Sequence, residues 1–407
     1  MRKIVLLICD GMGDLPASKL GGKTPLQFAK TPHLDRMAAE GQTGILDVIA
    51  PGVTPGSDTA HLSLLGYDAE KMYTGRGPFE AAGAKLEIRE GDVAFRCNFS
   101  TISPEKRVLD RRAGRIKKGT DELADAIDGL MIEDVQVIFR EGTEHRAALV
   151  FRGPGLSADI TDVDPHEIGK EILKSNPTSP EGEKTSRILN KFVQETIRIL
   201  GEHPVNKARI SEGKAPANAI LPRGGGLVPN IPSLPERAKM KIAGVAGVTL
   251  VKGVFRACNI DIAEKPEWTG GIDTDIMSKA QGAVELLADH DLVVINIKAT
   301  DLSGHDNVPQ EKVGIIERID KGAGWIMENM PEGTVFAVTA DHSTPCEKGD
   351  HTGDPVPLVI HCKGNRADQT TSYDEITCSH GGLGRLCGKE LLPVLMNMAG
   401  RTEKFGA

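Results

Sequence analysis

Four apolar runs rich in β-branched residues recur along the chain, and segments with a helical pattern separate them. The runs read KIVLLICD at residues 3–10, KIAGVAGVTLV at 241–251, DLVVINIKATD at 291–301 and TVFAVTADH at 334–342. A strand that is apolar at almost every position is buried on both faces, and strands that alternate with helices pair in parallel. The sequence therefore predicts an α/β fold with a mostly parallel sheet flanked by helices.

Other segments fit the same alternation. Residues 31–40 and 278–288 have the spacing of apolar residues that is typical of helices, and PVPLVIHC at 355–362 predicts another short strand.

The pattern changes between residues 84 and 176. Short segments of alternating polarity follow one another there, with one helix-like piece at 121–130. This pattern is typical of a smaller α+β unit. We predict that residues 84–176 form an inserted domain, and that 1–83 and 177–407 form the main α/β domain. The turn-rich stretch SNPTSPEGE at the end of the insertion is the candidate hinge, and 184–201 predicts an amphipathic packing helix.

Composition and charge exclude several classes of protein. The formal net charge of −8 comes from interspersed acidic and basic residues, and only 4% of residues are aromatic, so no nucleic-acid partner is expected. The N-terminal apolar run is shorter than the roughly 7–15 residues of a signal peptide, and no stretch approaches the roughly 20 residues of a membrane span. The seven cysteines form no CxxC pair, which favours reduced thiols. We expect a cytoplasmic protein without a membrane partner; its oligomeric state stays open.

Three of the apolar runs end in an aspartate: Asp10, Asp301 and Asp341. Ligands of open parallel sheets gather at the carboxyl ends of the strands, so these aspartates are expected to meet at one edge. A single aspartate there is commonly only a helix cap. Three of them with histidines nearby, namely His305, His342 and His351, indicate a site for Mn²⁺, Zn²⁺ or Co²⁺.

The number of candidate ligands favours two ions. With the Ser57 hydroxyl, the aspartates and histidines supply more donors than one tetrahedral site can use. Two ions roughly 3.5–4 Å apart stabilise both the attacking and the leaving oxygen of a phosphoryl displacement.

Ser57 lies in PGSDTAHLSLLGYD, and two roles are open for it. A serine between a Pro-Gly turn and a helical pattern is a good helix N-cap. The same hydroxyl could be a nucleophile, because helix N-terminal N–H groups favour a phosphate and a metal lowers the pKa of a bound hydroxyl. The two roles are compatible, and Asp58 is expected to be a capping or supporting residue.

The motifs CDGMGD, TPGSDTAHLSLLGYD, GRGPFEA, DRRAGR, GTEHRA, KATDLSGHDN and TADHSTPCEKGDHTGDPVP resemble those of one family over essentially the whole chain. They are similar to the archaeal-type, cofactor-independent phosphoglycerate mutases of the alkaline phosphatase superfamily. The resemblance implies an alkaline-phosphatase-like α/β domain with an inserted phosphotransferase domain. It also implies interconversion of 3-phosphoglycerate and 2-phosphoglycerate, in glycolysis and gluconeogenesis, without 2,3-bisphosphoglycerate.

The same resemblance assigns the site residues. Ser57 would be the serine that becomes phosphorylated. One metal would be held by Asp10, Ser57, Asp341 and His342, and the other by Asp301, His305 and His351. Mn²⁺ is the expected ion, with Zn²⁺, Co²⁺ and Mg²⁺ as alternatives.

A phosphoglycerate also needs cationic side chains for its phosphate and carboxylate groups. In the inserted unit the candidates to hold the glycerate are Arg111, Arg112, Arg115, His145 and Arg146. Arg223 in LPRGGG is a candidate phosphate ligand from the main domain, and Asp164 and His166 in DVDPH are candidates for substrate contacts or for the acid and base.

Two other functions compete with the mutase. A metal-dependent phosphohydrolase, or another phosphomutase of the superfamily, would share the metal motifs but would not need to hold a dephosphorylated acceptor. A catalytically silent metal-binding protein would lack the nucleophile or a ligand, and none is missing from the sequence.

Overall fold

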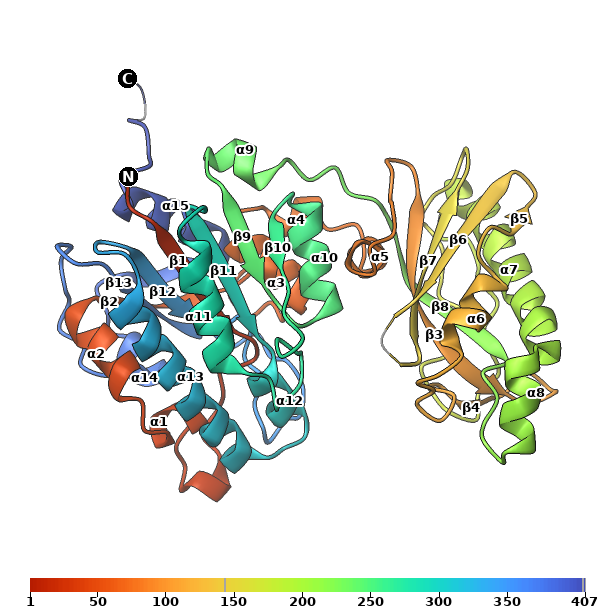
Figure 1. Ribbon diagram of the computed structural model, residues 1–407, viewed down its shortest axis with the longest axis horizontal. Coiled ribbons are helices and arrows are strands. Elements are labelled where there is room, and N and C mark those ends of the chain that lie inside the picture. The colour runs from red at the N-terminus through yellow and green to blue at the C-terminus, as the bar shows by residue number, and fades with distance from the viewer. Residues whose placement is uncertain (143, 405, 407) are drawn as a thin grey trace. The chain divides into compact units, whose positions relative to one another are not determined.

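The computed structural model describes residues 1–142, 144–404 and 406, and the chain divides into two compact units (Figure 1). Unit 1 comprises Met1–Met72 and Ile231–Ala407, and unit 2 comprises Tyr73–Asn230. The predicted boundaries at residues 84 and 176 therefore both fall inside unit 2.

Unit 1 is built on an eight-stranded sheet. Its strands are β1 (Ile4–Cys9), β2 (Gln42–Asp47), β9 (Ile242–Val245), β10 (Asp261–Ala263), β11 (Leu292–Ile297), β12 (Val335–Thr339), β13 (Val356–His361) and β14 (Gly384–Cys387). Their order is β10-β9-β11-β1-β12-β13-β2-β14. β13 runs antiparallel to both neighbours, whereas the other neighbouring pairs are parallel. The predicted α/β fold with a mostly parallel sheet is confirmed.

Two groups of helices accompany this sheet. One gathers around α13 (Pro309–Asn329) and contains α1 (Pro25–Phe28), α2 (Pro32–Glu40), α11 (Ile276–Leu286) and α12 (Ala299–His305). The other gathers around α3 (Ser57–Leu64) and contains α4 (Ala69–Met72), α10 (Thr249–Ala257) and α15 (Gly388–Met398). The remaining helices of unit 1 are η1 (Ser18–Leu20), α9 (Leu234–Ala238) and α14 (Glu375–Cys378). Strands β1, β11 and β12 are buried at every position, as predicted from their continuous apolar sequence.

One predicted strand is shorter than expected. In the run at 241–251, β9 ends at Val245, and the residues from Thr249 onward begin α10. After β9, a Cβ atom on Gly247 would lie 2.1 Å from the backbone of Thr269, so only a glycine lets the two backbone segments approach this closely. Short apolar runs do not distinguish a buried strand from a buried helix, and here the run contains both.

Unit 2 contains an antiparallel sheet. Its strands are β3 (Val93–Ile102), β4 (Val108–Asp110), β5 (Met131–Ile132), β6 (Val135–Glu141), β7 (Arg146–Arg152) and β8 (Ala219–Leu227). The order is β4-β3-β7-β6-β5, with β8 also paired to β3. The helices are α5 (Gly77–Gly83), α6 (Thr120–Asp125), η2 (Pro180–Gly182), α7 (Glu183–Glu202) and α8 (Pro204–Ser211). Among the described residues of both units, none of the helices is both long and apolar enough to cross a bilayer.

Alternation along β3 divides its side chains between two faces of the sheet. Phe95, Cys97 and Phe99 belong to the core of unit 2, together with Phe192 of α7. Arg96, which lies between Phe95 and Cys97, points to the opposite face. That face also carries a second, smaller apolar cluster formed by Ala81, Leu86, Ala94, Ala148 and Val150, so Arg96 lies beside buried apolar residues.

Two elements explain why unit 2 extends beyond the predicted insertion. The helix predicted at 184–201 is α7, but its apolar side fills the core of unit 2. Strand β8 then pairs antiparallel with β3. Both lie after residue 176 in the sequence, and both bury their apolar residues against the sheet that residues 84–176 begin.

Replacing Phe192 by alanine should destabilise unit 2 by about 3–5 kcal/mol, because it opens a cavity in the aromatic core. Urea unfolding followed by circular dichroism measures this loss. Both tryptophans, Trp268 and Trp325, lie in unit 1, so tryptophan fluorescence should change much less. Gln194→Ala, on the exposed side of α7, is the control and should stay within about 0.5 kcal/mol of the wild type. A Phe192→Ala loss below about 1 kcal/mol would contradict this core.

Candidate active site

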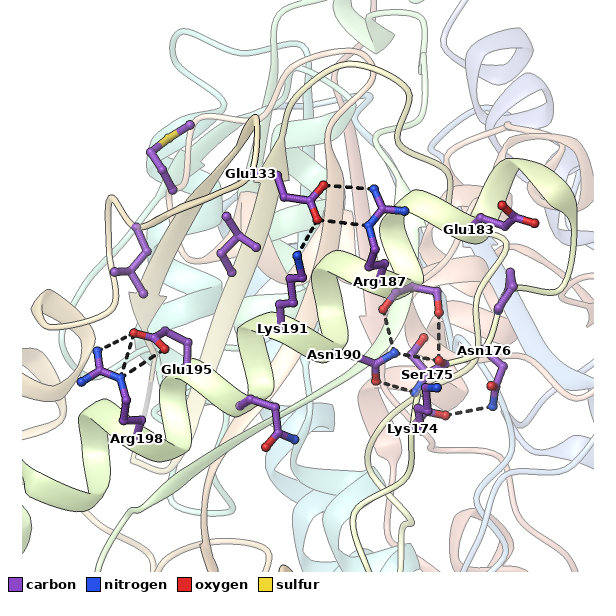
Figure 2. A pocket seen from close by; sticks show the side chains of 16 residues that line it. Glu133, Lys174, Ser175, Asn176, Glu183, Arg187, Asn190, Lys191, Glu195 and Arg198 are labelled. Carbon is purple, nitrogen blue, oxygen red and sulfur yellow. Dashed lines mark hydrogen bonds and ion pairs between the residues drawn. The ribbon is translucent and has the colours of Figure 1, made fainter.

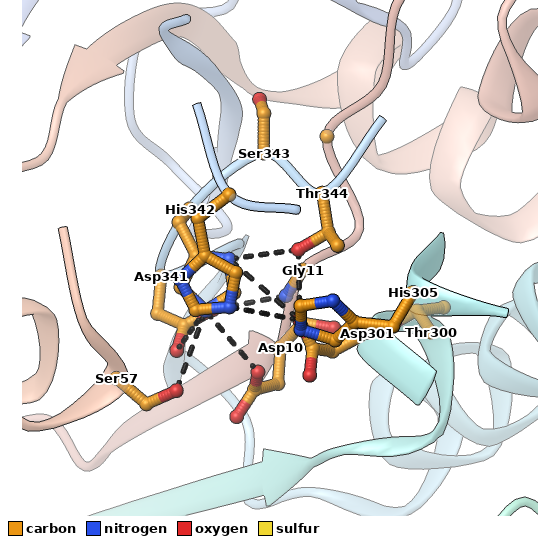
Figure 3. A network of polar contacts seen from close by, with 12 residues as sticks. Asp10, Gly11, Ser57, Thr300, Asp301, His305, Asp341, His342, Ser343 and Thr344 are labelled. Carbon is orange, nitrogen blue, oxygen red and sulfur yellow. Dashed lines mark hydrogen bonds and ion pairs between the residues drawn. The ribbon is translucent and has the colours of Figure 1, made fainter. Parts of the chain in front are cut away.

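Three aspartates from distant parts of the chain gather at the carboxyl edge of the unit 1 sheet (Figure 3). Asp10 directly follows β1, Asp341 follows β12, and Asp301 lies in the first turn of α12, which follows β11. All three carboxylates are buried. The parallel strands place them together, as the strand-end pattern indicated.

Asp301, His305 and His351 form a first ligand group. Asp301 Oδ1 lies 3.4 Å from His305 Nε2 and 3.3 Å from His351 Nε2. His305 Nδ1 lies 2.8 Å from the Gly349 carbonyl oxygen, and His351 Nδ1 lies 2.9 Å from that of Pro55. Because a carbonyl oxygen only accepts, each Nδ1 donates its proton, and in the neutral imidazole Nε2 then presents a lone pair. This is how metal-binding histidines are held.

Asp10, Asp341 and His342 form a second ligand group, a group of side chains that could hold a metal ion, and the Ser57 hydroxyl lies beside it. His342 Nε2 lies 3.3 Å from Ser57 Oγ, 3.5 Å from Asp10 Oδ1 and 3.3 Å from Asp341 Oδ2. Asp341 Oδ2 is buried and accepts no hydrogen bond from any residue that the structure describes. A buried carboxylate oxygen without a donor is costly, and a bound cation would satisfy it.

The pKa shifts of Asp341 and His342, both in the second group, also fit a bound metal ion. Burial and the nearby Asp10 carboxylate raise the pKa of Asp341 well above its ordinary value. Burial lowers the pKa of His342 well below its ordinary value, which leaves the neutral imidazole that metals bind. A divalent cation would stabilise the Asp341 carboxylate. The donor sets of both groups therefore fit divalent ions.

Ser57 does not cap helix α3. The helix begins at Ser57, its N-cap is Gly56, and the Thr59 hydroxyl bonds to the Gly56 backbone. The N-cap prediction was therefore displaced by one residue. The Ser57 hydroxyl faces His342 Nε2 and Lys298 Nζ, each at 3.3 Å. The Asp58 carboxylate accepts the N–H of Thr59 in the same first turn.

Lys298 links the two ligand groups, and the sequence analysis did not single it out. Its Nζ lies 2.8 Å from Asp10 Oδ1 and 2.7 Å from Asp301 Oδ2. Burial lowers the pKa of this ammonium, but the surrounding carboxylates outweigh burial and raise it. The sequence does contain a signal for Lys298. This residue directly follows the apolar β11 and precedes Asp301 by three residues, about one helical turn.

Two further buried residues support Ser57 and Asp10. His61 Nδ1 donates to the Ser57 carbonyl oxygen at 2.6 Å. Asn296 Nδ2 donates to Asp10 Oδ2 at 3.1 Å and faces His61 Nε2 at 3.2 Å. Burial lowers the pKa of His61, so the ring is neutral. His61 lies in the segment HLSLL and Asn296 in LVVINI. Because their sequence neighbours are apolar, the sequence alone indicates only core packing for these two residues.

Asp164 is the centre of a charged cluster in unit 2. Its buried carboxylate accepts from Arg111 Nε at 3.1 Å, from Arg111 Nη2 at 2.5 Å and from Arg223 Nη1 at 3.2 Å. It also accepts the backbone N–H of His166 at 2.9 Å. Burial raises the pKa of Asp164, but these hydrogen bonds prevail and lower it. Asp164 is therefore an ionised group that orients two guanidinium groups.

Arg96 is a further member of this cluster that the sequence analysis missed. It lies opposite Arg223 across strands β3 and β8. Its Nε is buried without a hydrogen bond among the described residues, although Glu80 Oε1 lies 3.6 Å away. Burial is the largest cause that lowers its pKa to about 10, and neighbouring arginines add to it. Two guanidinium groups that face each other across a strand pair repel, so this face is suited to an anion.

The other predicted cationic residues differ from Arg111 and Arg223 in their burial and contacts. Arg112, Arg115 and Arg146 are exposed, and His145 is buried. Burial, Arg146 and Arg112 lower the pKa of His145 to about 4, so this imidazole is neutral. In the described part of the chain, Arg115 makes no hydrogen bond or ion pair with the cluster. Arg223 was expected in the main domain but lies in unit 2, because β8 pairs with β3.

A large groove in unit 2 contains none of the predicted site residues (Figure 2). It has a volume of about 1090 Å³ and is bordered by α7, β5 and residues 174–177. Several of its charged side chains pair with one another: Glu133 bonds both Arg187 and Lys191, and Arg198 bonds Glu195. Its size alone therefore does not make it the reaction site.

Adding Mn²⁺ to metal-free protein should raise the melting temperature of unit 1 by several degrees, because an ion that binds only the folded state stabilises it. Asp341→Asn should reduce this shift in differential scanning fluorimetry, because it removes a ligand of the second group. Asp289→Asn, at an exposed position of unit 1, should keep it. An equal shift in the Asp341 and Asp289 variants would show that the ion binds elsewhere.

Known proteins resemble this chain over its whole length. A family model described as 2,3-bisphosphoglycerate-independent phosphoglycerate mutase matches residues 38–206. Proteins with that name from Methanopyrus kandleri and Methanothermobacter thermautotrophicus are 50% and 47% identical to it. These alignments cover 100% of this chain, and 98% and 100% of the respective relatives.

Solved structures agree. A protein from Pyrococcus horikoshii, 41% identical, superposes with a TM-score of 0.87 over 100% of this chain and 99% of its own. A cofactor-independent phosphoglycerate mutase from Thermoplasma acidophilum, 39% identical, gives a TM-score of 0.74 over 98% of this chain and 100% of its own. The site geometry and these full-length similarities lead to one conclusion: the chain belongs to the 2,3-bisphosphoglycerate-independent phosphoglycerate mutases.

Proposed function

We propose that this mutase interconverts 3-phosphoglycerate and 2-phosphoglycerate through a phosphoserine at Ser57, with two divalent metal ions and without 2,3-bisphosphoglycerate. One observation carries the proposal. The Ser57 hydroxyl, in the first turn of α3, faces both Lys298 and His342 amid two groups of metal-ligand side chains. The reaction belongs to glycolysis and gluconeogenesis, which matches the cytoplasmic location that we expect.

Each ligand group would hold one ion. Asp301, His305 and His351 would bind the first, and Asp10, Ser57, Asp341 and His342 would bind the second. Bound divalent ions lower the pKa of a hydroxyl and neutralise charge on a transferring phosphoryl group. The mixture of oxygen and nitrogen donors favours Mn²⁺, with Zn²⁺, Co²⁺ and Mg²⁺ as alternatives.

The protein's own residues then act in order. The Ser57 hydroxyl loses its proton as Oγ attacks the substrate phosphorus, the bond between phosphorus and the glycerate oxygen breaks, and that oxygen takes up a proton. Lys298 Nζ and the N-terminal N–H groups of α3 hold the phosphoryl oxygens. The other glycerate hydroxyl next loses its proton and attacks the phosphoserine, the bond between phosphorus and Ser57 Oγ breaks, and Ser57 Oγ takes up a proton.

The cluster around Asp164 would hold the glycerate in place meanwhile. Arg111, Arg223 and Arg96 offer guanidinium groups for its carboxylate and phosphate. Asp164 is already bonded to two of these arginines, so we assign it to orientation rather than to proton transfer. His166, whose side chain is 56% exposed and lies 3.5 Å from Asp162, is the better candidate for the acid–base group.

A phosphohydrolase is the competing function, and the cluster is what disfavours it. A hydrolase needs only the metal groups and a nucleophile or water. It does not need a cluster of arginines that holds the dephosphorylated glycerate.

Incubation with 3-phosphoglycerate and Mn²⁺, without 2,3-bisphosphoglycerate, should yield 2-phosphoglycerate and little inorganic phosphate. Ser57→Ala should lower kcat by at least about 10³-fold, because no other group replaces the nucleophile. The same variant should still bind Mn²⁺ in a calorimetric titration. Inorganic phosphate as the main product would end the mutase proposal in favour of the hydrolase.

Arg223→Lys should raise KM for 3-phosphoglycerate about 10–100-fold, because it removes a charge-assisted hydrogen bond that lysine cannot replace bidentately. Its Mn²⁺ affinity should stay unchanged. Arg187→Lys, at the groove in the same unit, is the matched control and should behave as the wild type. An Arg223 variant with wild-type KM would remove this residue from the substrate site.

A further inference from the structure

Thr344 occupies an unusual position between the two ligand groups (Figure 3). It is fully buried, and its Oγ1 lies 2.8 Å from Asp301 Oδ1 and 3.0 Å from His342 Nδ1. Asp301 belongs to the first ligand group and His342 to the second. One hydroxyl therefore touches both groups.

The chemistry of these contacts fixes the direction of both hydrogen bonds. A carboxylate only accepts, so Thr344 donates its single hydroxyl proton to Asp301. Its oxygen then presents lone pairs to His342 Nδ1, which must donate. In the neutral ring this leaves the lone pair on Nε2, the nitrogen that faces Asp10, Ser57 and Asp341. Asp301 of the first group thus fixes the direction of the Thr344 hydroxyl, and this hydroxyl fixes the His342 tautomer that the second group needs.

The backbone of Thr344 is held just as firmly. Its N–H donates to the Gly13 carbonyl oxygen at 3.0 Å, and its own carbonyl oxygen accepts from Lys312 Nζ at 3.0 Å. The fully buried Lys312 also donates to Asp14 Oδ2 at 2.7 Å and to Gly13 O at 3.2 Å. This ammonium ties the loop after β1 to the loop after β12, which carry Asp10 and His342 respectively.

Two glycines pack closely against Thr344. A Cβ atom on Gly11 would lie 2.6 Å from Thr344 Oγ1, and one on Gly304 would lie 2.4 Å from the Thr344 carbonyl oxygen. Glycine at both positions allows Thr344 to fit between the loop that carries Asp10 and the helix that carries Asp301.

We propose that Thr344 is a positioning residue whose hydroxyl couples the two ligand groups, so that both bind metal tightly only while this bridge is intact. The inference rests on the proposed function, because it assumes one ion in each group. It adds a residue that binds neither metal nor substrate.

Thr344→Val removes the hydroxyl but keeps the shape, and Thr344→Ser keeps the hydroxyl but removes the methyl group. Calorimetric titration of metal-free protein with Mn²⁺, well below the melting temperature, measures stoichiometry and affinity. The wild type should bind two ions per chain. Thr344→Val should weaken binding about 10–100-fold, as loss of a group that orients a metal ligand does. Thr344→Ser should stay within about threefold of the wild type.

Thr43→Val, a buried threonine of unit 1 that bonds Asp368 and Thr370, is the control and should bind two ions as the wild type does. If Thr344→Val does not fold, Thr344→Ala and Thr344→Ser provide the same comparison, since they differ only by a hydroxyl. Wild-type Mn²⁺ affinity in the variant without the hydroxyl would overturn the bridge and leave the proposed function intact. A wild type that binds fewer than two ions would overturn both.

Discussion

The structure of unit 1 depends on a concentration of buried negative charge at the carboxyl edge of its sheet. Asp10, Asp301 and Asp341 are held there by buried parallel strands, which cannot move apart without breaking the core. Burying each carboxylate costs on the order of several kcal/mol unless it is paired. Among the described residues, Lys298 is the cation that pairs with two of them, and Asp341 Oδ2 remains without a hydrogen bond. Divalent ions would resolve this imbalance and also supply the chemistry of phosphoryl transfer.

The surrounding residues fix the orientation of the histidines and the position of the Nδ1 proton. Backbone carbonyls receive the Nδ1 protons of His305 and His351, and the Thr344 hydroxyl receives that of His342. His61 donates a hydrogen bond to the Ser57 carbonyl oxygen, and Asn296 donates one to Asp10 Oδ2. Unit 2 carries cationic side chains: in its sheet Arg96 lies opposite Arg223, Glu80 lies 3.6 Å from Arg96, and the buried Asp164 pairs with Arg223.

The sequence predicted those parts of the site that follow directly from strand order. Asp10 and Asp341 come right after continuous apolar strands, so the parallel sheet had to bring them to one edge. Residues that act through tertiary contacts were harder to find. His61 and Asn296 lie in apolar segments and resemble ordinary core residues. Thr344 has no special pattern, because it lies in a loop and its partners, Asp301 and Lys312, belong to helices α12 and α13. Arg223 was assigned to the wrong unit because β8 is glycine-rich and pairs with a strand far away in the sequence.

We infer that two cations complete the buried carboxylate edge. Anomalous diffraction from crystals grown with Mn²⁺ would locate them. Two peaks per chain are expected, one among Asp301, His305 and His351 and the other among Asp10, Ser57, Asp341 and His342. A single peak, or peaks away from both groups, would contradict this inference.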